Sequence, residues 1–259
     1  MIINSYRFGG YSTEYQAILT RATALGATHP STAIKIKGDA MIASLKSNGI
    51  WSRLDVLWVL STDGDSNFAL INWKDPDNFL CTKVLTPTFT SNSGYKSASL
   101  GYLNTGWNPS TNGVNYLLDD ASAFTYIKGN AISANTDFGA NDSTNQVDIV
   151  ARRTSTISRG PINQGLNNNI GNSVANDGLH MTSRALSTEY NFYVPTQFSV
   201  NVVSNSTGIV NLPVFICCLN FNGSPLVYET VRTQALIGFG DNLQDKITEL
   251  YSAIDTYMA

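Results

Sequence analysis

Residues 68–112 read FALINWKDPDNFLCTKVLTPTFTSNSGYKSASLGYLNTGWNPSTN, and this stretch decides the fold class. Its short apolar runs are broken by Asp-Pro, Asn-Ser-Gly and Asn-Pro, which are turn-forming sequences. The stretch closes on an aromatic-rich run at residues 102–107. The pattern predicts short β-strands joined by tight turns, and nothing in it is typical of a catalytic site.

The β pattern continues on both sides of this stretch, from residue 50 to residue 239. Residues 54–60 (LDVLWVL) form an almost unbroken apolar run, as expected for a strand buried on both faces. Asn222-Gly223 separates two apolar runs and predicts a tight hairpin. Further strands are predicted at 69–73, 88–91, 102–107, 121–128, 147–152, 178–184, 191–194, 198–203, 213–220, 226–231 and 235–239. Many short strands with polar turns favour a sandwich or barrel over alternating βαβ units.

Helices are predicted only near the two ends. Ser12 caps an amphipathic segment reaching residue 27, and a second such segment ends at Asn48-Gly49. A third begins at Asp241, with Gln244 at capping-box spacing, and carries an apolar stripe to residue 258. We therefore predict a mainly β, antiparallel jelly-roll sandwich with two N-terminal helices and a C-terminal helix. Residues 1–50 would be the helical segment and 51–259 the sandwich domain, together in one compact unit.

The composition excludes several classes of function. Charged residues make up only 14% of the chain, against the usual quarter, and the net charge is −3. Without a basic stripe, nucleic-acid binding lacks its electrostatic term. No apolar window is long enough to span a bilayer, and the first residues lack the pattern of a Sec signal. Cys81, Cys217 and Cys218 make no disulfide framework, and we interpret the adjacent pair as buried structural thiols on opposite faces of a strand.

Candidate catalytic and metal-ligating groups are sparse. His29 and His180 lack a second His or a Cys at zinc-ligand spacing. Glycoside hydrolysis needs two facing carboxyl groups, yet Glu229 stands alone in the sequence, and we interpret the acids as solvated or turn-forming. Asp63 and Asp65 alternate as calcium ligands would, although a simple turn explains them too. The sequence predicts no catalytic, cofactor-binding or metal residues, and the chain is not expected to be an enzyme.

Contact surfaces are the better functional candidates. The aromatic residues Tyr95, Tyr102, Trp107 and Tyr116 would offer flat faces to a sugar or a protein partner, the alternative being that they belong to the core. Ile34 and Met41 would form a docking face for a neighbouring subunit, the alternative being that both helices cover the sandwich. The Asn-, Ser- and Gly-rich loops 130–146 and 163–177 are predicted to be edges that contact partners.

Several motifs, taken in order, resemble a known family. They are LKSNGIWSRLDVLWVL (45–60), NWKDPDN (72–78), GYLNTGWNPS (101–110), DDASAFTYI (119–127), PIN (161–163), GLHMTSR (178–184), CLNFNGSPLVY (218–228), IGFGDNL (237–243) and ITELYSAIDTYM (247–258). The chain resembles bacteriophage and prophage tail, fibre or minor structural proteins with a concanavalin A-like (laminin-G-type) sandwich. The resemblance implies that fold and a virion setting, and it supplies no catalytic residues.

The function expected from the residues and the resemblance is a non-enzymatic structural component of a phage particle. It would be made in the bacterial cytoplasm and located in the virion, in the tail, a fibre or the head surface. Its expected partners are other virion proteins and further copies of itself, with no nucleic acid, membrane or cofactor. The alternative is a carbohydrate-binding module that recognises host surface glycans. A polysaccharide-cleaving enzyme is a second alternative, disfavoured because no strand carries paired carboxylates.

Overall fold

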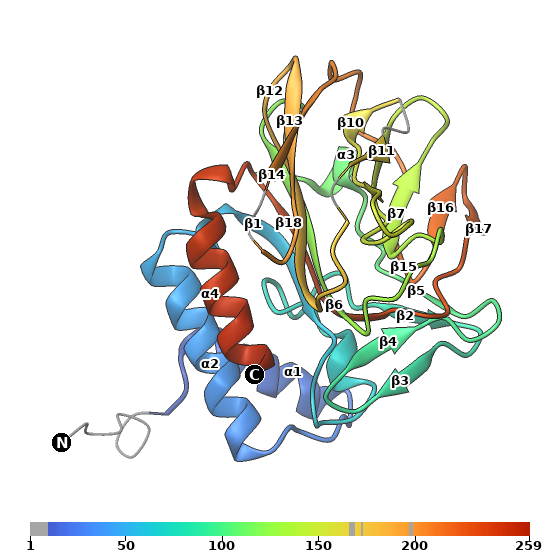
Figure 1. Cartoon of the computed structure of the whole chain (residues 1–259). Coiled ribbons are helices and arrows are strands. Elements are labelled where there is room, and N and C mark those ends of the chain that lie inside the picture. The colour runs from blue at the N-terminus through green and yellow to red at the C-terminus, as the bar shows by residue number, and fades with distance from the viewer. Residues whose placement is uncertain (1–9, 166–168, 172, 197–198) are drawn as a thin grey trace.

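The computed structural model describes residues 10–165, 169–171, 173–196 and 199–259, and its centre is a pair of β-sheets packed face to face (Figure 1). Sheet A has the order β14 (Ser199–Val203), β13 (Glu189–Tyr193), β12 (Gly178–Leu186), β6 (Ala121–Lys128), β18 (Thr233–Gly240), β4 (Gly94–Lys96) and β3 (Thr88–Thr90), and β1 (Leu54–Val59) also pairs with β18. Sheet B has the order β10 (Ile162–Gln164), β8 (Gln146–Ile149), β7 (Phe138–Asn141), β15 (Phe215–Ile216), β5 (Tyr102–Asn104) and β2 (Thr82–Val84). The hairpin β16 (Leu219–Phe221) and β17 (Ser224–Leu226) joins sheet B at β7, and β9 (Ser158–Arg159) pairs with β11 (Asn169–Ile170). The predicted mainly β sandwich is confirmed.

The main core lies between the two sheets because successive side chains of each strand point to opposite faces. In β6, Ala123 and Ile127 point into the inter-sheet core, whereas Phe124 points to the other face of sheet A. Phe138 and Ile149 enter the same inter-sheet core from sheet B. Burial on both faces explains why the central strands of sheet A read as long apolar runs.

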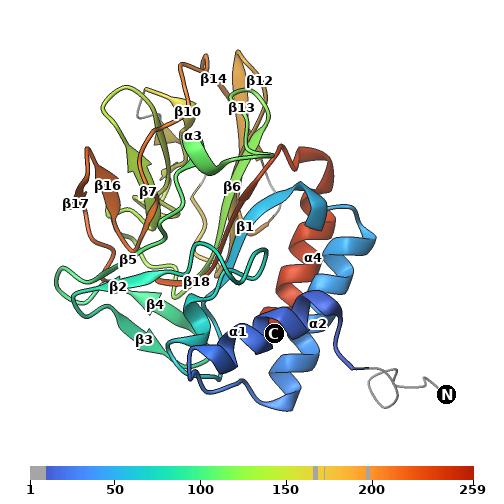
Figure 2. The same cartoon turned by 180° about the vertical axis from the view of Figure 1, so that it is seen from behind.

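Three helices cover the outer face of sheet A: α1 (Thr13–Ala24), α2 (Thr32–Ser47) and α4 (Ile247–Met258) (Figures 1 and 2). Met41 is only 2% exposed, and Ile34 packs against the same apolar cluster. The predicted docking face is therefore wrong for Met41, which this chain's own helices and sheet cover, whereas Ile34 stays partly exposed at its edge. The alternative, in which the helices cover the sandwich, describes the structure.

The helix boundaries follow local capping chemistry, with one correction. The Ser12 and Ser31 side chains accept hydrogen bonds from backbone N–H groups in the first turns of α1 and α2. Gly49 follows α2 with φ +73°, as predicted for a left-handed helix end. Asp241 does not cap the last helix: its carboxylate pairs with Arg53 at 2.7 Å, and α4 begins only after a 3₁₀ turn.

Several predicted strands are confirmed and others are wrong. The predicted strand 121–128 matches β6, and the Asn222-Gly223 hairpin is present with φ 49° and 84° at its two turn residues. The predicted strand 69–73 instead begins inside the 3₁₀ turn Phe68–Leu70 and contains only an isolated bridge at Asn72, and of 226–231 only Leu226 is in a strand. The loops 130–146 and 163–177 contain β7 and β11, and residues 166–168, 172 and 198 of the predicted segments lie outside the described ranges. Short strands rich in Asn and Ser carry too little apolar pattern to be recognised.

Candidate functional site

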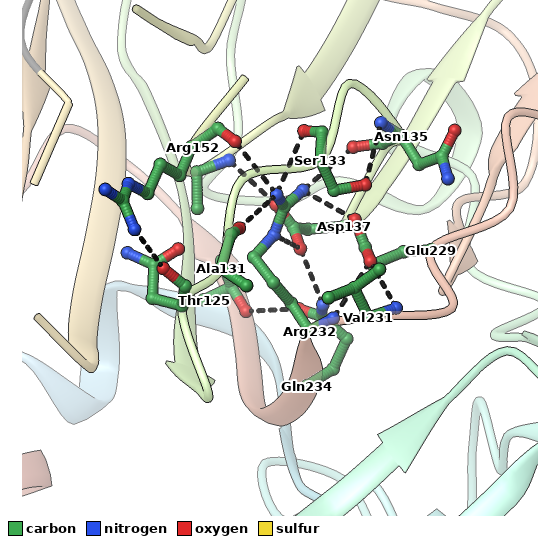
Figure 3. Close-up of polar contacts among 12 residues, drawn as sticks. Thr125, Ala131, Ser133, Asn135, Asp137, Arg152, Glu229, Val231, Arg232 and Gln234 are labelled. Atoms are coloured by element: carbon green, nitrogen blue, oxygen red, sulfur yellow. Dashed lines mark hydrogen bonds and ion pairs between the residues drawn. The ribbon is translucent and has the colours of Figure 1, made fainter. Parts of the chain in front are cut away.

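A buried charge cluster lies between the sheets and consists of Arg232, Asp137, Glu229 and Gln234 (Figure 3). The Nε of Arg232 donates to Asp137 Oδ1 at 2.8 Å, and its Nη2 lies 2.7 Å from Glu229 Oε2. Gln234 donates from Nε2 to Asp137 Oδ1 at 2.7 Å. All four side chains are fully buried. Glu229 is thus paired and buried, so the interpretation of the acids as solvated is wrong for Glu229 and Asp137. Glu229 does form a local turn, because its Oε1 accepts from the backbone N–H groups of Val231 and Arg232.

The remaining donors of Arg232 hold loops in place. They bond to backbone carbonyl oxygens of four residues spread over two segments: Ala131, Ser133, Asn135 and Arg152 (Figure 3). Burial alone would lower the pKa of Arg232, but Asp137 and Glu229 outweigh it and raise that pKa. Burial, followed by the charge of Asp137, raises the pKa of Glu229. Because the cluster is sealed from solvent and saturated with internal partners, it can fix the fold but cannot reach a dissolved substrate.

His180 is a further buried titratable group of the interior. Its Nδ1 lies 3.3 Å from the Gly178 carbonyl oxygen, and burial lowers the pKa of His180 to about 4. Across the described part of the chain, no three His, Cys, Asp or Glu residues come together as metal ligands.

Asp63 and Asp65 serve the loop in which they lie. Asp63 Oδ1 accepts from the Ser31 backbone N–H, and Asp65 accepts from the N–H groups of Thr28, Asn67 and Phe68. These bonds tie the loop after β1 to the connection between α1 and α2. The turn explanation accounts for both carboxylates without a calcium ion.

The four aromatic residues predicted to contact a ligand lie in the core or its edge. Three of them, Tyr95, Trp107 and Tyr116, are at most 1% exposed. The rings of Trp107 and Tyr116 pack edge to face, with their centroids 5.9 Å apart. Tyr102 is 8% exposed and packs on Phe215, on the outer face of sheet B. The prediction of stacking faces is therefore wrong for this set, and the core alternative is confirmed: Tyr95 in β4 and the loop residues Trp107 and Tyr116 all fill the inter-sheet core.

The cysteines are buried as predicted, but Cys217 and Cys218 lie in the bend between β15 and β16 and not within a strand. All three are free and buried; Cys217 packs into the inter-sheet core, and Cys218 packs with Tyr102 and Phe215 on the opposite face.

An open hollow of about 680 Å³ lies at the rim of the sandwich. Residues of β10 and β14, the edge strands of sheets B and A, contribute to it, and Figure 2 shows where these two strands lie. We call it the rim hollow. Its described lining comprises Ser143, Thr144, Gln164, Gly165, Val203, Ser204, Asn205 and Thr207. Six of these eight residues carry a hydroxyl or an amide group, although their apolar atoms supply most of the exposed surface. The volume of the rim hollow falls within the usual range of small-molecule sites. The two loops predicted to contact partners supply half of it.

Hydrogen bonds across the two sheets build the rim hollow. The Ser204 hydroxyl donates to Gln164 Oε1, and the Thr207 hydroxyl donates to Asn145 Oδ1 at 2.8 Å. Beneath them, the guanidinium of Arg184 donates to the Ile162 carbonyl in β10 and to the Ser204 carbonyl after β14. The buried Arg184 therefore joins the edges of sheets A and B and fixes the floor of the rim hollow.

The sequence signal for this site is an absence of charge. Residues 160–176 and 190–228 contain no Asp, Glu, Lys, Arg or His, and both stretches contribute to the rim hollow. Tyr102 and Trp107 were predicted to contact a ligand because aromatic side chains often do so, whereas Gln164, Asn205 and Thr207 are residue types common in any loop. Only the pairing of distant strands brings these three together.

Comparisons with known proteins support the fold alone. No protein-family model and no curated protein matches the sequence. Among solved structures, Trypanosoma rangeli sialidase in complex with sialic acid matches with a TM-score of 0.51 and 10% identity, over 85% of this chain and 39% of that one. The same sialidase with 2,3-difluoro-KDN matches with a TM-score of 0.51 and 10% identity, over 86% and 40%. The HCR/D W1238A mutant matches with a TM-score of 0.50 and 7% identity, over 80% of this chain and 53% of that one.

The chain thus spans well under two thirds of the length of these structures, and identities this low show a shared architecture only. Over the described residues, no helix has both the length and the apolar character required to cross a membrane.

Proposed function

We propose that this chain is a non-catalytic carbohydrate-binding module whose ligand occupies the rim hollow. The observation that carries the proposal is the rim hollow itself: an open site in which hydroxyl and amide groups converge from two sheets, held by the buried Arg184. Sugars present many hydroxyl groups that exchange hydrogen bonds with such a lining. The sandwich shared with a sialidase that was solved with sialic acid agrees with this assignment.

A binding role is favoured over hydrolysis because of the groups that line the rim hollow. Glycosidases use two carboxyl groups flanking the scissile bond. The described lining contains neither Asp nor Glu. The buried carboxylates of Asp137 and Glu229 are committed to Arg232 and sealed from solvent.

The test is a glycan array followed by calorimetry on the best glycan, comparing Asn205→Ala with Asn201→Ala. Asn205 is exposed and lines the rim hollow, whereas Asn201 is exposed on the neighbouring strand β14 outside it. Loss of one or two hydrogen bonds should raise the Kd of Asn205→Ala roughly 3- to 10-fold and leave Asn201→Ala unchanged. Absence of any binding glycan, or equal affinity of both variants, would contradict the proposal.

A second candidate, compatible with the first, is a structural component of a bacteriophage particle. It is supported by the family resemblance of the ordered motifs and by a surface with few charges. Such a component would present the rim hollow outward and assemble through other surfaces. Mass spectrometry of purified phage particles is the direct test, and absence of the protein from them would exclude this role.

A further inference from the structure

We infer that the rim hollow binds a neutral sugar and disfavours ligands that carry a carboxylate, sulfate or phosphate group. The inference rests on the proposed function and specifies its ligand class. It also separates this chain from the sialidase with the similar fold, which was solved with the acidic sugar sialic acid.

The first argument is the lining. None of the eight described lining residues carries a charge. The surrounding sequence, residues 160–176 and 190–228, contains no charged residue either. An anionic group that loses water on entering a site needs a compensating cation or several strong donors. The described lining of the rim hollow offers no cation.

The second argument is the sign of the nearest fixed charges. Asp142 lies in the turn beside Thr144 and accepts hydrogen bonds from the Thr144 and Asn145 N–H groups. Burial alone would raise the pKa of Asp142, but these backbone bonds outweigh it and lower that pKa, so the group stays ionised. Asp119 accepts a hydrogen bond from the Ser206 hydroxyl at 2.6 Å, next to the lining residue Thr207. Both carboxylates would repel an anionic ligand.

Arg184 is the one nearby cation that could argue for an anionic ligand. Its Nη2 has no hydrogen-bond partner among the described residues. The side chain is nevertheless fully buried, its other donors hold five backbone carbonyl groups, and it does not line the rim hollow. It therefore acts on the ligand only through the position of Ser204, and its positive charge interacts with the carboxylate of Asp119.

The experiment uses the full chain and a matched pair of oligosaccharides that share one core, one of them ending in a carboxylated sugar and the other lacking it. Calorimetry should show binding of the neutral member and at least tenfold weaker binding of the carboxylated member. The neutral affinity should stay constant between about 50 mM and about 0.5 M NaCl, since no charge pair is screened. Tighter binding of the carboxylated member that weakens with salt would overturn the inference while leaving carbohydrate binding intact. Binding of neither member, nor of any glycan on an array, would overturn the proposed function itself.

A pair of charge variants checks the same point inside the rim hollow. Asn205→Lys and Asn205→Asp place opposite charges at one lining position. With a neutral ligand both should weaken binding of the uncharged oligosaccharide by a similar factor, because each only removes the amide. Opposite effects of the two variants on that oligosaccharide would show that charge matters to the bound ligand and would overturn the inference.

Discussion

At the scale of single residues, the interior of this sandwich is unusual because it buries a connected set of charges. Arg232 satisfies two carboxylates and four backbone carbonyl groups at once. A buried pair of this kind gives little net stability compared with an apolar replacement of the whole group. Loss of one member is far more costly, since it leaves a buried charge without its partner.

We therefore expect Arg232→Met to lower the free energy of unfolding by about 3–5 kcal/mol, because Asp137 and Glu229 lose the buried cation that pairs with both of them. The matched control is Arg153→Met, at a position where the arginine donates to Asn169 at the surface. That variant should change stability by less than about 1 kcal/mol. Urea denaturation of both variants measures their free energies of unfolding. If Arg153→Met lowers this free energy as much as Arg232→Met does, the buried cluster does not hold the loops in place.

His180 makes stability depend on pH in a direction that can be derived. Burial lowers the pKa of His180 from 6.5 to about 4, so between these values the unfolded chain binds a proton that the folded chain does not. The stabilising contribution is complete above the unfolded pKa and is lost as the pH falls toward 4, by roughly 3 kcal/mol in all.

His180→Gln should remove this part of the pH dependence, and His29→Gln, at the connection between α1 and α2, should keep it. Burial raises the pKa values of Glu229 and Asp148, so these two groups make the free energy of unfolding rise as the pH falls. Their contribution is the same in every variant and therefore cancels when the variants are compared. Unfolding free energies measured from pH 7 to pH 4 provide the test. If the unfolding free energies of wild type and His180→Gln change with pH in the same way, the assigned role of His180 is contradicted.

At the scale of elements, the sequence correctly predicted the helix ends and turns whose capping residues lie close by in the chain. Ser12 and Gly49 mark helix ends, and Asn222-Gly223 marks a hairpin, with partners only a few residues away. The helix start predicted at Asp241 was wrong because Arg53, 188 positions away in the chain, takes its carboxylate. The strand predicted at 69–73 failed because Asn72 accepts from the Leu57 N–H and fixes a buried turn against β1. Interactions between distant residues cannot be inferred from local pattern.

The same reason explains how much of the site was predictable. Composition predicted the amide-rich loops around Ser143 and Gln164 to be contact edges, and these loops do line the rim hollow, while contact with a partner stays a prediction. Their meeting with Asn205 depends on the strand order that places β10 and β14 at adjacent sheet edges. The aromatic residues were assigned to the wrong role because composition does not reveal which face of a strand is buried.

The close approach of β10 to the turn before β8 gives a prediction at this scale. A Cβ on Gly165 would lie 2.5 Å from the Thr144 carbonyl oxygen, whereas nothing lies within 4 Å of a Cβ on Gly171. Gly165→Ala should therefore push the two walls of the rim hollow apart, lower the free energy of unfolding by about 1–3 kcal/mol and weaken glycan binding. Gly171→Ala should change stability by less than about 0.5 kcal/mol. Thermal unfolding measures the stability of both variants, and calorimetry measures their affinity for the glycan. Equal stability and equal affinity of the two variants would contradict the prediction, because they would show that the loops rearrange to accept the Cβ on Gly165.

At the scale of the whole molecule, the helices and the rim hollow divide the sandwich into a closed side and an open side. The layer of α1, α2 and α4 covers sheet A, while the rim at β10 and β14 stays accessible (Figures 1 and 2). The buried helix layer contributes to stability, and the rim hollow is the proposed site of recognition. The two roles can therefore be separated by changes in different parts of the chain.

A truncated chain that begins at Ile50 tests the closed side. It would lose Ile18, Met41 and Leu45, and so expose the apolar residues Leu57 and Phe124 of sheet A together with the inner face of α4. Exposure of an apolar surface this large leads to aggregation rather than to a stable smaller domain. We expect the truncated protein to be insoluble, as judged by size-exclusion chromatography after expression.

Point variants of the full chain check that result without removing any element. Met41→Asp places a charge in the apolar layer between α2 and α4, whereas Ala43→Asp places it on the exposed side of the same helix. The first should unfold or aggregate because a buried unpaired charge is strongly unfavourable, and the second should remain folded. A soluble, folded fragment from residue 50 onward, together with a folded Met41→Asp variant, would instead mean that the helices are an accessory layer available for docking to another subunit.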